Sequence, residues 1–97
     1  MQRDNEKKLG EVLRQWVASK RRLQKELRQR RIKRLWEERM GPPIAKRTSS
    51  ILLVRSKLYL SISSASLRQE LHMQRGKIRD FLNEELGERV IEEVIVK

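Results

Sequence analysis

Basic residues are concentrated in one stretch of the sequence, Lys20 to Arg34. This stretch contains nine lysines and arginines and a single acid, Glu26. Residues 1–47 carry a net charge of +10 and residues 48–97 a net charge of +1, so the formal charge of +11 lies almost entirely in the first half. Such a density of cations is typical of proteins that bind a polyanion, because each cation can displace a counterion from a phosphate. The stretch therefore predicts a nucleic-acid contact; a solvated face that keeps the protein soluble is the plainer alternative.

The phosphate contacts that we expect come from this stretch, from the loop after it and from a later hairpin. They are Lys20, Arg21, Arg22, Lys25, Arg28, Arg31, Lys33, Arg34, Lys46, Arg47, Arg55 and Lys57. Tyr59 is a candidate for base stacking, because it alternates with the apolar residues of its strand and can face outward. Packing against a neighbouring strand is an equally good interpretation of Tyr59. Trp16 and Trp36 fall on apolar faces, so we expect both in the core.

The residue types that catalysis and metal binding need are missing or scattered. The chain has no cysteine and a single histidine, His72, which excludes disulfides, thiolate nucleophiles and the usual zinc sites. The serines between residues 61 and 66 lack a triad partner, and the adjacent acidic pairs point in diverging directions along a helix or strand. No glycine-rich phosphate loop is present. We therefore expect no enzyme, no metal and no cofactor.

Two helical patterns must position the basic stretch. We expect one helix from about Asp4 to Ala18 and a second from Lys20 to Met40, ended by the glycine and two prolines that follow. No glycine or proline separates the two patterns, so one bent rod is the alternative. On the second helix, Leu23 and Leu27 lie opposite Ile32 and its neighbours at about 100° per residue. We expect the first set to pack on the first helix and the second set on the rest of the protein.

The second half of the chain predicts two strands, a helix and a last strand. The strands are Ile51–Arg55 and Lys57–Ser63, joined by a turn at Arg55-Ser56-Lys57. A third helix is expected to begin at a cap on Ser63 or Ser64, with Ser66 and Gln69 as a capping box, and to end at Gly87. The last strand, Arg89–Val96, has apolar residues on both faces, which predicts a central or covered position in the sheet.

This order predicts an α+β fold with two layers, in which helices cover one face of a three-stranded sheet. We expect residues 1–97 to form a single domain, with 20–97 as its core and 1–19 as a candidate peripheral helix. The polar N-terminus does not have the pattern of a signal peptide, and the longest apolar run, Ile51 to Val54, is too short to span a bilayer. A cytoplasmic protein is therefore expected.

From Ile32 to Val96 the sequence resembles the DciA-like family, bacterial proteins related to a loader or operator of the replicative helicase. The motifs that carry the resemblance are Trp36, Gly41, Ile44-Ala45, Thr48, the segment Ile51 to Leu71, Lys77, Leu82-Asn83, Leu86-Gly87 and the final VIEEVIV. The resemblance implies a K-homology-like fold, DNA binding and contact with the hexameric replicative helicase, in the cytoplasm and in association with the nucleoid. The GxxG loop with which K-homology domains clamp a nucleic-acid backbone is absent.

Two alternatives fit the same charge. One is an RNA- or ribosome-associated factor with a K-homology-like fold. The other is a protein-interaction module whose basic helix docks on an acidic partner. A membrane-surface role is the least favoured, because the second helix is basic on all sides.

Overall fold

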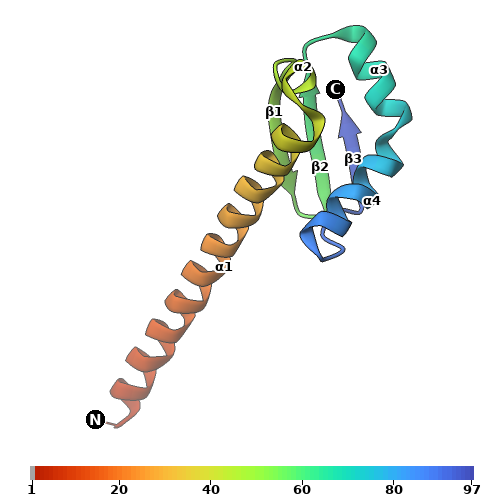
Figure 1. Ribbon diagram of the computed structural model, residues 1–97. Coiled ribbons are helices and arrows are strands. Elements are labelled where there is room, and N and C mark those ends of the chain that lie inside the picture. Colours follow the sequence, from red (N-terminus) through yellow and green to blue (C-terminus); the bar gives the residue numbers. More distant parts are fainter. Residues whose placement is uncertain (1) are drawn as a thin grey trace.

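A long helix ends on a three-stranded sheet, with the N-terminus far from the rest of the protein (Figure 1). The computed structural model describes the backbone of residues 2–97 and the side chains of residues 4–97. The elements are α1 (Gln2–Met40), α2 (Pro42–Ala45), β1 (Thr48–Val54), β2 (Lys57–Ile62), α3 (Ala65–Met73), α4 (Arg75–Leu86) and β3 (Glu93–Val96). The α+β class with helices against a three-stranded sheet is as predicted.

The sheet is mixed and has the order β1-β2-β3. β1 and β2 form an antiparallel hairpin, whereas β2 and β3 run parallel. The predicted turn is confirmed: Arg55 has a φ of 58°, the left-handed conformation that a tight turn requires. The last strand was predicted to be central or covered. It is not central, because β3 is an edge strand and β2 is central, but one of its faces is covered, since Val94 is buried in the core. Ile91, one of the apolar residues behind that prediction, is buried in the loop before the strand.

The core lies between one face of the sheet and the helices. Its largest fully buried side chains are Trp36, Ile32, Leu58, Leu60, Leu82 and Ile91. On the opposite face of the sheet Leu52 and Val54 are exposed. The indole Nε1 of Trp36 donates to Thr48 Oγ1 at 3.0 Å, and that hydroxyl donates to the carbonyl of Ile44 at 2.8 Å. This chain of bonds joins the end of α1 to α2 and to the start of β1.

The two predicted N-terminal helices are one continuous helix, α1. Nothing in the sequence around Ser19 stops helical hydrogen bonding, and a continuous helix cannot fold back on itself. The predicted packing of Leu23 and Leu27 on an earlier helix was therefore wrong. Every residue from Asp4 to Leu27 except Gly10 is exposed. Trp16, predicted in the core, is 60% exposed, so only Trp36 of the two tryptophans is a core residue.

The predicted third helix is divided at Gln74 into α3 and α4. Ser64 caps α3 as expected, since its side chain accepts a hydrogen bond from the backbone N–H of Leu67 at 3.4 Å. The hydroxyl of Ser66 lies 3.2 Å from that of Ser64, not in the predicted capping box. Gly87, with a φ of 73°, ends α4 as predicted. Among residues 2–97, no helix combines the length and apolar character that crossing a bilayer requires.

Replacing Leu60 by alanine tests the core. Leu60 is fully buried at the centre of the sheet, so L60A should lower the free energy of unfolding by about 2–5 kcal/mol. The matched control is L52A on the opposite face, where the side chain is 51% exposed and the loss should stay below about 1 kcal/mol. Urea denaturation followed by circular dichroism measures both. Equal losses would contradict the assignment of the two faces.

Candidate nucleic-acid interface

Four of the predicted contact residues line one groove between α1 and the β-hairpin. Arg21, Lys25 and Arg28 come from α1 and Arg55 from the turn between β1 and β2, with Gln24 and Leu53 beside them. We call these four cations the basic groove. The helical residues recur at steps of four and three, so they share one side of α1. That side faces the hairpin turn, because β1 runs antiparallel to α1 along its last third (Figure 1).

The remaining predicted residues do not join the basic groove. Lys33 lines a separate groove further along α1, beside Ser49, Ser50 and Ile51. Lys46 and Arg47 lie at the other end of β1, a strand of seven residues and therefore about 23 Å long. Lys57 begins β2 and is paired in register with Glu93 of β3. The residues of α1 that point away from the groove are Lys20, Arg22 and Arg34, since they lie on other sides of the helix.

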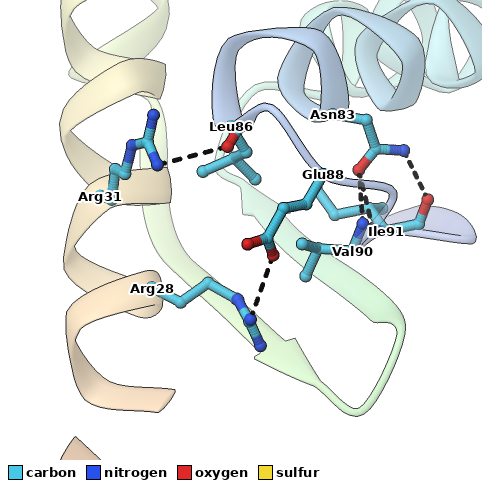
Figure 2. A network of polar contacts seen from close by, with 7 residues as sticks. All are labelled: Arg28, Arg31, Asn83, Leu86, Glu88, Val90 and Ile91. Atoms are coloured by element: carbon cyan, nitrogen blue, oxygen red, sulfur yellow. Dashed lines mark hydrogen bonds and ion pairs between the residues drawn. The ribbon is translucent and has the colours of Figure 1, made fainter. Parts of the chain in front are cut away.

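Arg28 and Arg31 also fasten α1 to the end of α4 (Figure 2). Arg28 Nη2 forms an ion pair with Glu88 Oε2 at 3.3 Å. Arg31 donates to the carbonyls of Glu85 at 3.0 Å and Leu86 at 3.3 Å. These carbonyls end α4 and have no partner within the helix, so a guanidinium is a suitable cap. Arg31 is thus engaged by the fold, although it was predicted as a phosphate contact.

The other three cations of the basic groove form no ion pair with a described residue. In the part of the chain that the structure describes, the ion pairs involve Arg28, Arg39 and Arg79 but none of Arg21, Lys25 and Arg55. The pair of Arg28 with Glu88 is itself solvent-exposed, and such pairs contribute only about 0–1 kcal/mol. A phosphate can therefore replace Glu88 as the partner of Arg28 at little cost.

Gln29 is a structural residue that the sequence did not reveal. Its side-chain Nε2 donates to the carbonyl of Ile51, and its Oε1 accepts from the backbone N–H of Leu53 at 2.9 Å. The amide thus takes the place of a neighbouring strand along the open edge of β1. It holds α1 beside β1 and so sets the separation between the helix and the hairpin turn. Gln29 lies three residues before Ile32 and seven before Trp36, so it is on the same side of α1. That spacing was the signal in the sequence that could have placed Gln29 against the sheet.

Asn83 fixes the loop between α4 and β3 (Figure 2). Its side chain donates to the carbonyl of Ile91 at 2.8 Å and accepts from the N–H groups of Val90 at 3.1 Å and Ile91 at 2.9 Å. This loop carries Glu88, the partner of Arg28. Asn83 therefore positions a carboxylate at the rim of the basic groove.

Tyr59 lies on the face of the sheet away from the helices and is half-buried. Its neighbours in register are Leu52 on β1 and Ile95 on β3. The Nζ of Lys97 lies 5.3 Å from the centre of the ring. Tyr59 thus belongs to a row of side chains across the strands, on a different surface from the basic groove.

No group of three or more histidine, cysteine, aspartate or glutamate side chains in the described part of the chain is placed to hold a metal ion. His72 is exposed, with Nη1 of Arg75 at 3.3 Å from its Nε2.

In a comparison with protein families, residues 8–96 match the family described as Dna[CI] antecedent, DciA. The match includes the exposed part of α1 from Lys8 onward as well as the sheet. No curated protein and no solved structure matches the chain.

Replacing Gln29 by alanine tests its role at the edge of β1. Q29A leaves two backbone groups of β1 without their partner, so we expect unfolding to become easier by about 1–3 kcal/mol. Amide hydrogen exchange at Leu53 should also become faster. Q24A, five residues earlier on α1 and exposed, is the control and should change neither quantity. An unchanged exchange rate at Leu53 in Q29A would show that this bond does not protect the strand edge.

Proposed function

Because the chain belongs to the DciA family, we propose that it is a non-enzymatic, cytoplasmic bacterial domain that binds nucleic acid, DNA in preference to RNA, during loading of the replicative helicase. The family supports the connection with the helicase. The observation that carries nucleic-acid binding is the convergence of Arg21, Lys25, Arg28 and Arg55 on one groove.

The basic groove suits a phosphate backbone. Its cations come from two elements, so they flank a strand laid between them from both sides. Successive cations on α1 are about 4.5–6 Å apart along the helix axis, which lets neighbouring phosphates meet successive side chains. Lys20 and Arg22 extend the positive charge along α1 beyond the sheet. Counterion release from these contacts then supplies the affinity.

The chemistry of the basic groove favours binding that does not depend on base sequence. Its charged groups are all cations, which contact phosphates, and Gln24 is its only amide. Discrimination between bases needs several hydrogen bonds to base edges, which this set does not offer. Binding by side-chain cations also replaces the backbone clamp of the GxxG loop that the sequence lacks.

Neutralising the basic groove tests the proposal. For the unaltered protein, the logarithm of the affinity for a DNA oligonucleotide should fall linearly with the logarithm of the salt concentration between about 50 and 300 mM. Arg21→Gln with Lys25→Gln removes two phosphate contacts, so the slope should become shallower by about 1.4–1.8. Fluorescence anisotropy with labelled single- and double-stranded oligonucleotides measures the slope.

The matched control is Lys77→Gln with Arg89→Gln, which removes the same charge from exposed positions elsewhere. Its slope should stay close to that of the unaltered protein. Equal changes in the two double variants would show that only net charge matters. Competition with RNA of matched length separates DNA binding from the RNA-associated alternative, which a strong preference for structured RNA would favour.

Contact with the helicase is tested apart from DNA. The protein should co-elute with the purified hexameric replicative helicase after nuclease treatment, and the R21Q/K25Q variant should still do so. Co-elution that disappears with nuclease would show that DNA alone bridges the two proteins. That result would remove the helicase contact from the proposal and leave nucleic-acid binding intact.

A further inference from the structure

An apolar stripe runs along the exposed part of α1. Its residues, each between 40% and 60% exposed, are Leu9, Val12, Leu13, Trp16, Val17, Leu23 and Leu27. Isolated exposed apolar side chains are ordinary, but a contiguous row of this length marks an interaction surface. The rest of the protein comes close to it only at Leu27, which lines a groove with Leu86 and Val90 and is still 53% exposed.

The spacing of the stripe is that of a coiled-coil seam. Steps of four and three residues alternate along Leu9, Leu13, Trp16, Lys20, Leu23 and Leu27, and only Lys20 is not apolar. The stripe also faces away from the sheet, since Leu27 and Ile32 are separated by about 140° around the helix. A second helix can therefore lie along the seam without meeting the sheet.

We propose that the occupant is a second copy of this chain, with the two α1 helices antiparallel. The charge on α1 argues for this direction. Residues 4–17 carry three acids and three bases, whereas Lys20 to Arg34 carries nine bases and one acid. Parallel helices would place the two basic stretches side by side. Antiparallel helices place each basic stretch beside the neutral part of the other copy.

One antiparallel register satisfies every position of the seam. It sets Leu9 opposite the second copy's Leu27 and Leu13 opposite the second copy's Leu23. Trp16 then lies opposite the second copy's Lys20. Within one chain the Nζ of Lys20 lies 5.2 Å from the Trp16 ring centre, a cation–π contact. The same two residue types meet between the copies, so the pair across the seam is favourable as well. A parallel seam would instead stack Lys20 on Lys20.

The same register continues to charged pairs at both ends of the seam. Glu6 lies opposite the second copy's Arg30, and by the twofold symmetry this pair occurs twice. The overlap from Glu6 to Arg30 is three and a half heptads, about 37 Å of helix. This is the length over which a heptad seam indicates a coiled coil.

The dimer keeps the two sheets apart and the two basic grooves open. The twofold axis passes near Ala18, so the two Trp36 residues lie about 54 Å from each other along the rod. Arg21 and Lys25 lie on the side of α1 away from the seam. If the proposed function holds, one dimer presents two separate binding grooves to the same nucleic acid. Formation of the dimer does not depend on that function.

Cysteine cross-linking tests the register, since the chain has no cysteine of its own. Leu13→Cys and Leu23→Cys proteins, mixed and mildly oxidised, should form a disulfide between them, and neither should cross-link alone. Ala18→Cys, on the outer side of α1, measures random oxidation. Cross-linking of either seam variant with itself, above the level of A18C, would indicate parallel helices and overturn the proposal.

Light scattering coupled to size exclusion tests the dimer itself. The unaltered protein should have twice the monomer mass at about 100 µM, and a monomer at that concentration would overturn the proposal. Leu13→Glu with Leu23→Glu should raise the dimer dissociation constant at least about 100-fold, because carboxylates would enter an apolar seam. Ala18→Glu is the matched control and should stay dimeric. A fully dimeric L13E/L23E protein would place the interface elsewhere.

Discussion

The burial of Ile32 and Trp36 against the sheet fixes the path of the long helix, and the other features follow from that path. Both side chains are fully buried. The indole of Trp36 is bonded to Thr48, and two turns earlier Gln29 satisfies the edge of β1. With its last third held along β1, α1 must pass the hairpin turn at its middle. The basic groove is the result, because the residues of α1 at that point are arginine and lysine and the turn contributes Arg55.

α1 divides its surface among three tasks. One side enters the core through Ile32 and Trp36 in the last turns and carries the cations of the basic groove in the turns before them. The opposite side is the apolar stripe. The arginines nearest the sheet are partly used to hold the fold, as Arg31 is at the end of α4. Those further out have no ion pair in the described residues, which leaves their charge available to a polyanion.

Local patterns predicted the local structure well, including the hairpin turn, the Ser64 cap and the end of α4 at Gly87. They failed where the burial of a side chain depends on which distant part of the chain packs against it. Trp16 and Trp36 each follow an aliphatic residue, Val12 or Ile32, by four positions, yet Trp16 is exposed and Trp36 is buried. Periodicity shows that a face is apolar and does not show what covers it. The cations of the site could be located by charge, but which of them converge depends on how α1 packs on β1. Gln29 fixes that packing through its bonds to Ile51 and Leu53, and its spacing from Ile32 and Trp36 does not show that it binds a strand edge.

The central claim is that nucleic acid lies in the basic groove between α1 and the hairpin. The most direct measurement is an NMR titration of the ¹⁵N-labelled protein with a short single-stranded oligonucleotide. The account predicts that the largest amide shifts fall on Arg21 to Arg28 and on Val54 to Lys57, two segments far apart in sequence. Shifts concentrated on the outer face of the sheet around Tyr59, or spread evenly over all exposed cations, would contradict it.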